Sequence, residues 1–347
     1  MNSNFLKALS NADGIASNEK EVRQAILAEV GKLSYEKTTD GLGSLIFTKR
    51  SQQSDKSIMI CGHMDEVGFM VRSISELGLI HLMVVGGVKP LAQHLQKVRI
   101  TTFDGRKISA VINGDFQNGA TENLYCDLGA TSAEEVAALG VEVGNMVCYA
   151  TEFEAFAVKN IYAGKAFDDR LACFVMAELM KELAEVELPL TVHFANTSSE
   201  EVGIRGAKTA VKKINPDIVF VIDVATFSTQ FVRNHTNQRQ IGAGPILTHF
   251  DRTLAPNLEM LQYVKETAKK AELPLQLDMF NAGGTDGGEA HKVNEGKPTV
   301  VTILPVRYGH CAYSIVNGQD VDQMIALYKQ LLLDFNEETY RRMVNFI

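Results

Sequence analysis

Four short, nearly continuous runs of apolar residues constrain the fold of this 347-residue chain more than any other feature. The runs cover residues 57–61, 190–195, 218–222 and 298–303. Such runs are typical of strands covered on both faces, whereas a half-exposed strand alternates polar and apolar residues. Helical apolar periodicity is present at 171–183, 257–270 and 321–335. The sequence therefore predicts an α/β fold with a mostly parallel central sheet flanked by helices.

Residues 70–160 have a different pattern of apolar and turn-forming residues. Strand-like segments there are broken by turn dipeptides such as Asp104-Gly105 and Gly86-Gly87, with one short helix expected at 132–139. This pattern predicts a small β-rich, barrel-like domain inserted into the α/β domain. The larger domain would then consist of residues 1–69 and 161–347.

Composition excludes several classes of protein. A formal net charge of -8 without a dense Lys/Arg cluster argues against nucleic-acid binding. Since no apolar run approaches the roughly 18 to 20 residues that cross a bilayer, we expect no membrane insertion. The N-terminus lacks the pattern of a secretion signal, and five scattered cysteines without a CxxC pair suit a reducing compartment. We therefore expect a cytoplasmic protein.

Metal-competent side chains follow the predicted core strands. His63, the pair Glu200-Glu201, Asp223 and His310 each lie at or shortly after such a strand, and Asp168 opens a helix. Strand-end acids and histidines also occur as helix caps or solvated loop residues, so one of them alone means little. Together they would meet at the carboxyl edge of the sheet, where open α/β folds bind ligands. Imidazole and carboxylate ligands suit zinc and its neighbours without choosing among them.

The chain also resembles a known family, the M42 metallo-aminopeptidases, which include tetrahedral and glutamyl aminopeptidases and were formerly called cellulase M. The resemblance rests on segments in family order: His63-Met64-Asp65, residues 164–170, residues 199–203, Asp223, residues 283–286 and Gly309-His310. It implies a zinc-exopeptidase type of fold and removal of the N-terminal residue from peptide substrates.

The resemblance also implies roles for individual residues. Two divalent ions, zinc or cobalt with manganese as a further candidate, would be bridged by Asp168. One ion would also bind His63 and Asp223, and the other would bind Glu201 and His310. Glu200 would act as the general base. In an extended backbone its neighbour Glu201 points the other way, so the two acids can have separate tasks.

Other polar residues have supporting roles in this interpretation. Asp65, two residues after His63, is expected to accept the imidazole N–H and so to assist catalysis. Asp169 and Arg170 are expected to form a local ion pair. Substrate binding is assigned to Gly283, Gly284, Thr285 and Asp286, although a plain turn explains the glycines equally well. Six further histidines have no matching motif and are expected to be structural: His81, His94, His193, His235, His249 and His291.

The resemblance further implies a homo-oligomer, a dodecamer built from dimers through the inserted domain. Two alternatives remain open at this stage. Paired carboxylates also serve glycoside hydrolases such as endoglucanases, although adjacent acids suit their geometry poorly. The chain could also be a catalytically silent metal-binding oligomer, but such a protein would not need a free acid at Glu200.

Overall fold

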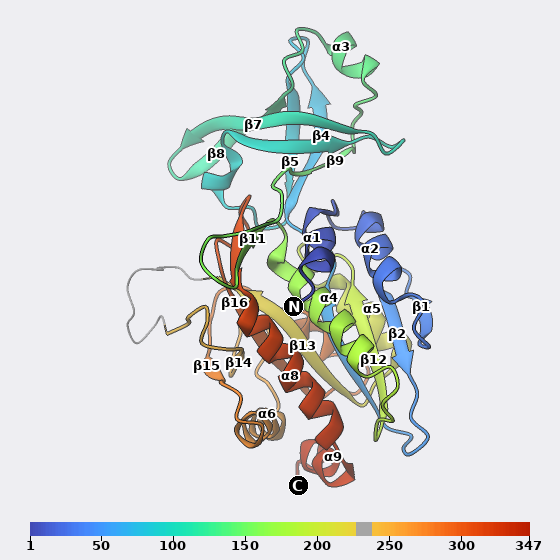
Figure 1. The fold of residues 1–347 in the computed structure, drawn as a ribbon. Helices are drawn as coiled ribbons and strands as arrows, with labels where there is room; N and C mark the ends of the chain where they lie inside the picture. Colours follow the sequence, from blue (N-terminus) through green and yellow to red (C-terminus); the bar gives the residue numbers. More distant parts are fainter. Residues whose placement is uncertain (227–237) are drawn as a thin grey trace.

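A computed structural model describes residues 1–226 and 238–347, and His235 lies outside them. Figure 1 shows two parts: a larger part of helices around a twisted sheet, and a smaller β part at its upper end. The chain enters the β part after β3 (Ser57–His63) and returns before β11 (Ile161–Gly164). The expected insertion of a β-rich domain into an α/β domain is therefore confirmed.

The central sheet is mixed. Its core strands β12 (Thr191–Thr197), β3, β13 (Ile218–Ala225) and β16 (Thr299–Arg307) are parallel neighbours in that order. These strands are almost entirely buried, as their unbroken apolar runs predicted. The margins are antiparallel and are formed by β1 (Glu36–Thr39), β2 (Leu45–Lys49), β17 (Ser314–Asn317), β11 and β10 (Glu154–Ala155). A further strand, β14 (Ile246–Thr248), pairs with β16 and with β15 (Gln276–Asp278). The predicted parallel pairing thus holds for the core strands and for β14 with β15, and the sheet as a whole is mixed.

Helices cover both faces of this sheet. The larger apolar core lies under α1 (Ser3–Asn11), α2 (Lys20–Val30), α4 (Phe167–Glu182), α6 (Leu258–Lys270) and α8 (Gly318–Asp334), and α9 (Glu337–Val344) contacts α6. The other face packs against α5 (Arg205–Ile214) and α7 (Gly287–Ala290). Most residues of α4 are buried, because this helix lies between the sheet and α1, α2 and α8.

The inserted part is a closed barrel with the strand order β4 (Gly68–Ile74), β5 (Ile80–Val85), β8 (Ala120–Asp127), β7 (Lys107–Gln117), β6 (Gln96–Thr101) and β9 (Met146–Tyr149). Its own apolar core includes Phe69, Ile100 and Val147, and the short helices η1 (Pro90–Gln93) and α3 (Ala133–Ala138) connect its strands. Because closure pairs every strand on both sides, this small sheet has no free edge.

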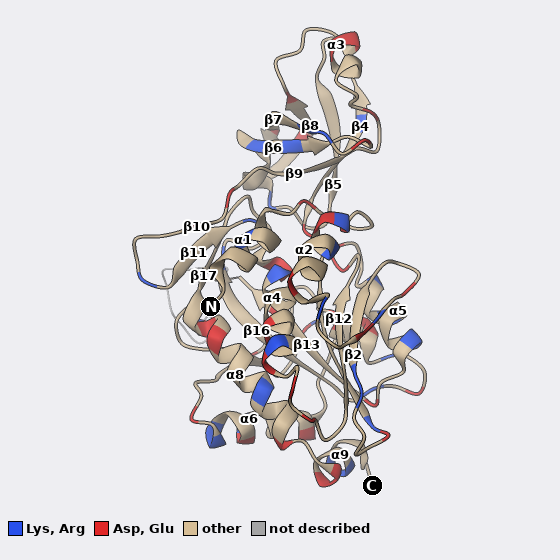
Figure 2. Ribbon diagram, turned by 45° about the vertical axis from the view of Figure 1, so that its right-hand side comes forward, with Lys and Arg blue, Asp and Glu red and all other residues tan. Residues whose placement is uncertain are grey.

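Charge is distributed over the whole molecule. In Figure 2 Lys and Arg positions occur in both parts and are interspersed with Asp and Glu positions. Within the described ranges, no helix has the length and apolarity that a membrane crossing requires.

Candidate metal centre

The side chains predicted from the strand ends meet at one edge of the sheet. His63 is the last residue of β3, Asp223 lies near the end of β13, and Glu200 follows β12. Since β12, β3 and β13 are parallel neighbours, their carboxyl ends lie side by side. This is also the edge at which the chain leaves for the barrel, so the cluster lies where the two parts of the molecule meet.

Asp168 lies between the two imidazoles of the cluster. Its Oδ1 is 3.1 Å from His63 Nε2, and its Oδ2 is 3.2 Å from His310 Nε2. Burial opposes ionisation of this carboxyl, but the hydrogen bonds from His310 and His63 hold its pKa below the usual value. A carboxylate with one oxygen directed at each imidazole could offer one oxygen to each of two cations.

The remaining acids of the cluster lack enough cationic partners. Burial, with the charges of neighbouring carboxylates, raises the pKa of Asp223 and of Glu200 well above the ordinary values. Glu201 Oε1 lies 3.4 Å from His310 Nε2 but is buried without a hydrogen-bond partner. Buried carboxylates are normally paired or bound to metal. This donor set therefore fits divalent cations.

Two groups within the cluster could each hold an ion. His63, Asp168 and Glu201 offer ligand atoms within 4.8 Å of one another, and so do His63, Asp169 and Asp223. Asp169 is not among the ligands that the sequence predicts. In the structure its Oδ2 accepts a hydrogen bond from the His63 backbone N–H at 3.1 Å. The assignment of five ligands to two ions stays a prediction, although all five lie in this cluster.

Asp65 supports the cluster differently from the sequence prediction. His63 Nδ1 is 3.0 Å from the Asp65 backbone carbonyl oxygen, whereas the Asp65 carboxylate is farther away, at 3.6 Å. The carboxylate instead accepts the backbone N–H groups of Glu200 at 2.9 Å and Glu201 at 3.1 Å. The tautomer of His63 is therefore set by a main-chain oxygen, while the Asp65 side chain holds both adjacent acids.

Glu200 and Glu201 differ in their surroundings. β12 ends at Thr197, so the two acids lie beyond the strand and strand alternation does not separate them. Glu201 is the more buried, with 4% of its side chain exposed, against 11% for Glu200. The nearest imidazole nitrogen to Glu200 is His63 Nε2, at 3.9 Å. Glu200 thus lies beside the candidate ligands but is farther from an imidazole and less buried than Glu201.

The barrel part contributes to the site through a loop that the sequence did not mark as functional. The carbonyl oxygen of Gly87 is 3.1 Å from His310 Nδ1, and the Lys89 N–H donates to the His310 carbonyl at 3.0 Å. A Cβ at Gly87 would lie 2.9 Å from His310 Nδ1, so this close approach requires glycine. The double glycine at 86–87 is a signal of this approach in the sequence, although by itself it predicts only a turn.

The expected ion pair between Asp169 and Arg170 is wrong. Both residues are described, and Arg170 instead contacts Glu66 Oε1 at 3.2 Å and donates to four backbone carbonyls. Asp169 accepts backbone N–H groups of His63 and Ala172. Asp169 and Arg170 lie in the first turn of α4, where adjacent side chains point in different directions, so each finds partners on a different neighbouring segment.

Arg170 belongs to a second buried group of charges beside the first. Lys165 contacts both oxygens of Glu66, at 2.6 and 2.8 Å, and Asp13 Oδ1 at 3.0 Å. Asp13 also contacts Arg99 of β6 at 2.7 Å and Lys107 of β7 at 2.8 Å. These bridges connect the segments on both sides of Asp168 to the segment after His63. No pattern in the sequence predicts this group, because its members are far apart along the chain.

Residues 283–286 divide into two pairs. Gly283 is exposed and Gly284 is half-buried, and their role in substrate contact stays a prediction. Thr285 and Asp286 are buried, and Asp286 Oδ2 accepts the Thr197 hydroxyl at 2.5 Å. Asp286 therefore contacts the end of β12 from within the protein, and burial raises its pKa to about 6.

The other described histidines lie outside the cluster. His193 Nδ1 is 2.8 Å from the Thr48 hydroxyl, and His94 contacts Asn113 and Thr121 within the barrel part. His291 Nδ1 is 2.7 Å from the Gly287 carbonyl oxygen. These contacts agree with the structural role expected for them.

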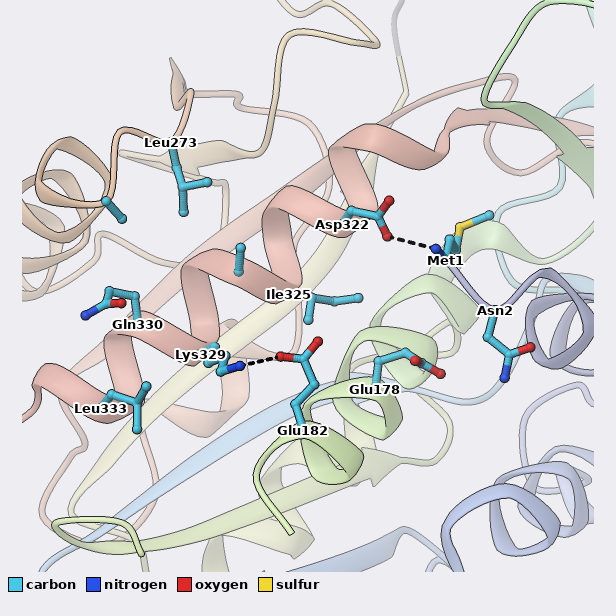
Figure 3. A pocket seen from close by; sticks show the side chains of 12 residues that line it. Met1, Asn2, Glu178, Glu182, Leu273, Asp322, Ile325, Lys329, Gln330 and Leu333 are labelled. Atoms are coloured by element: carbon cyan, nitrogen blue, oxygen red, sulfur yellow. Dashed lines mark ion pairs between the residues drawn. The ribbon is translucent and has the colours of Figure 1, made fainter. Parts of the chain in front are cut away.

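A cavity of about 580 Å³ lies away from this chemistry, between α4, α8 and the chain's N-terminus. Figure 3 shows its two ion pairs, Met1 with Asp322 and Lys329 with Glu182. None of the predicted site residues lines it.

Both the sequence and the fold of the chain are similar to those of known proteins. The sequence pattern of the family described as M42 glutamyl aminopeptidase matches residues 43–327. A glutamyl aminopeptidase of Lactococcus lactis is 32% identical over 98% of each chain, and a lysyl aminopeptidase of Pyrococcus furiosus is 28% identical over 94% of this chain and 96% of its own. The crystal structure of a TET aminopeptidase from a marine sediment thaumarchaeote superposes with a TM-score of 0.94 and 31% identity, covering 99% of this chain and 98% of that one.

Proposed function

This chain belongs to the M42 family of aminopeptidases and is a peptidase, and from that premise we propose that it removes the N-terminal residue of peptides by a two-metal mechanism with Glu200 as general base. The observation that supports this most is the position of Asp168 between His63 and His310, with Glu200 beside them. That arrangement places a free acid next to candidate ligands for two ions.

The ions would be held by the residues of the cluster. We propose His63 and Asp223 for one ion, Glu201 and His310 for the other, and Asp168 for both. Zinc or cobalt suits this mixture of imidazole and carboxylate, and manganese is a further candidate. Bound divalent ions would supply Lewis-acid polarisation and a lower pKa for water.

The chain's own residues would position the reaction and move its proton. Glu200 would take a proton from the attacking water as the water oxygen forms its bond to the first carbonyl carbon of the peptide. The same carboxyl would then give that proton to the departing amine nitrogen as the C–N bond breaks. Asp65 would hold Glu200 in place, because its carboxylate accepts the Glu200 backbone N–H.

Replacement of each of the two adjacent acids by glutamine tests this assignment. Glu200→Gln should fold, retain its metal and lose about 10² to 10⁴ in rate, the usual contribution of positioned proton transfer. Glu201→Gln should instead lose metal, and excess metal should restore part of its activity. Metal content and turnover should be measured on the same samples. A Glu200→Gln protein that lost its metal or kept its activity would refute the roles proposed here.

Glycoside hydrolysis is not favoured by the site. Its two carboxyl groups act from opposite sides of a bond and need no imidazole, whereas the acids here lie around His63 and His310. A silent metal-binding role would leave Glu200 without a task. Peptide cleavage that stays absent with zinc, cobalt and manganese each supplied would favour that alternative.

The assembly and location of the protein are also proposals. Leu91, Leu95 and Phe116 expose apolar side chains on the barrel part, at 82%, 75% and 55%. We propose that this part, residues 70–160, mediates a homo-oligomer, a dodecamer built from dimers, which light scattering would test. All five cysteines are free thiols, which supports the proposed cytoplasmic location.

The preferred N-terminal residue does not follow from family membership. One relative is a glutamyl aminopeptidase and another is a lysyl aminopeptidase. The N-terminal residues after which these two enzymes are named carry opposite charges. A panel of aminoacyl chromogenic substrates, assayed with each metal, would identify the specificity of this chain.

A further inference from the structure

The loop that contains the proposed general base is held by carboxylates outside the metal cluster, which consists of His63, Asp168, Glu200, Glu201, Asp223 and His310. Three consecutive backbone N–H groups donate to two acids: Ser199 to Glu19 at 3.2 Å, and Glu200 and Glu201 to Asp65. The side chains of Glu19 and Asp65 are both fully buried. Buried oxygens that accept consecutive N–H groups of a loop satisfy those donors and so fix the position of the loop.

Glu19 makes its contacts with this loop from a segment near the start of the chain. It lies at the N-terminus of α2, and one oxygen, Oε1, accepts the Ser198 hydroxyl at 2.6 Å, the Ser199 N–H and the Ser17 N–H at 3.0 Å. Its Oε2 contacts Arg23 Nη1 at 3.3 Å. Arg23 also donates to the carbonyl oxygen of Gly43, so it has an acceptor besides Glu19.

The backbone at Ser199 explains why such support is needed. Ser199 has a φ of 61°, in the left-handed region that residues other than glycine rarely adopt. This conformation turns the chain immediately before Glu200, and it persists only where surrounding contacts determine it. Ser198 is held on its other side as well, since a Cβ at Gly206 would lie 2.3 Å from the Ser198 carbonyl oxygen.

We propose that Glu19 is a positioning residue for the reaction, which holds the Ser198-Ser199 turn so that Glu200 reaches the reacting water. This inference rests on the proposed role of Glu200. Glu19 lies outside the metal cluster, so its contribution is geometric: the three donors require an oxygen at the position of Oε1, and the negative charge is secondary.

A pair of conservative variants separates position from charge. Glu19→Gln keeps the length of the side chain and an acceptor oxygen but removes the charge. Glu19→Asp keeps the charge but is one methylene shorter. We expect Glu19→Gln to retain nearly the wild-type kcat and Glu19→Asp to lose about 10²-fold in kcat, the effect of misplacing a reacting group by about 1 Å. KM and metal content should stay at wild-type values in both.

The same two substitutions at Glu29 provide a matched control. Glu29 is on the same helix and pairs with Lys181 at 2.6 Å, but it is partly exposed and is far from the loop. Neither Glu29 variant should change kcat. If Glu19→Asp does not fold, Ser198→Ala tests the same contact, because it removes the 2.6 Å hydrogen bond while keeping Glu19. It should lower kcat in the same direction.

Amide hydrogen exchange of residues 198–201 gives a readout that does not depend on activity. Exchange should be faster than wild type in Glu19→Asp and close to wild type in Glu19→Gln. If the wild-type protein cleaves no peptide, the proposed function fails, yet this exchange measurement still tests the contact. Equal kcat in the two Glu19 variants, or a greater loss in Glu19→Gln, would overturn the proposal.

Discussion

Two groups of buried carboxylates lie side by side where the barrel meets the central sheet, and they are neutralised in different ways. Asp13 and Glu66 contact the cations Lys165, Arg170 and Arg99 within 3.2 Å. We call these five residues the paired cluster. The metal cluster, defined by His63, Asp168, Glu200, Glu201, Asp223 and His310, has imidazoles as its nearest cationic side chains.

The pKa values of Asp13 in the paired cluster and of Asp223 in the metal cluster move in opposite directions. Burial would raise the pKa of Asp13, but Lys165 and Arg99 outweigh it and hold that pKa well below the usual range. Burial and the charge of Asp168 raise the pKa of Asp223. The difference teaches which buried acids need an external ion: the paired cluster contains its cations in the chain, whereas the metal cluster must bind them from solution.

Removal of divalent ions should affect the metal cluster most strongly. A chelator should abolish peptidase activity and lower the thermal midpoint, because an ion present at about 1,000 times its Kd stabilises the native state by about 4 kcal/mol. Addition of zinc, cobalt or manganese to separate samples should restore activity to different extents. Full activity after metal removal, verified by mass spectrometry, would show that the comparison is wrong.

Loss of one acid from the paired cluster should destabilise the fold. Glu66→Gln leaves Lys165 and Arg170 without their shared carboxylate, and removal of one partner from a buried ion pair costs about 3 to 5 kcal/mol. Urea unfolding would measure it. The control is Glu29→Gln, whose half-buried pair with Lys181 should cost less than about 1 kcal/mol. Equal losses in the two variants would contradict the distinction.

The same acid-to-amide change should have the opposite sign in the metal cluster. In chelated protein, the folded state binds a proton at Asp223 more tightly than the unfolded state, because its pKa is raised. Stability from this group is therefore greatest at low pH and falls as pH rises above the ordinary value of 3.8. Asp223→Asn should thus be more stable than wild type at pH 8, with the difference vanishing near pH 3.

Unfolding midpoints of the chelated proteins across that pH range would test this expectation. For Asp13 the sign is reversed: its stabilisation is present above the ordinary pKa and is lost as pH falls below it. A chelated Asp223→Asn protein less stable than wild type at pH 8 would remove the contrast between the clusters.

The smallest effect is expected at the margin of the paired cluster. Lys107→Ala removes a contact to Asp13 from a side chain that is 34% exposed, while Arg99 and Lys165 remain. Partly exposed bridges contribute little, so the loss should be below about 1 kcal/mol. Arg99→Ala, whose side chain is 16% exposed, should cost more under the same urea titration. A reversed order would show that Lys107 is the principal partner of Asp13.

Much of this architecture was predictable from the sequence, because its determinants are local. Unbroken apolar runs predict buried strands, and parallel neighbours place their carboxyl ends together, so His63, Glu200, Asp223 and His310 were expected to meet. The short strand-like segments and turn dipeptides at 70–160 likewise indicated the barrel. Ligand roles came from the family resemblance and not from spacing.

The tertiary structure alone decided which groups complete each other's hydrogen bonds. Arg170 contacts Glu66 instead of its neighbour Asp169, Asp65 receives backbone N–H groups of Glu200 and Glu201, and Glu19 reaches Ser198 across 179 positions of sequence. These contacts depend on side-chain atoms approaching within about 3 Å, which no periodicity in the sequence encodes. Hydrophobic patterning specifies which segments are buried, whereas the partner of each buried charge is set by how those segments pack.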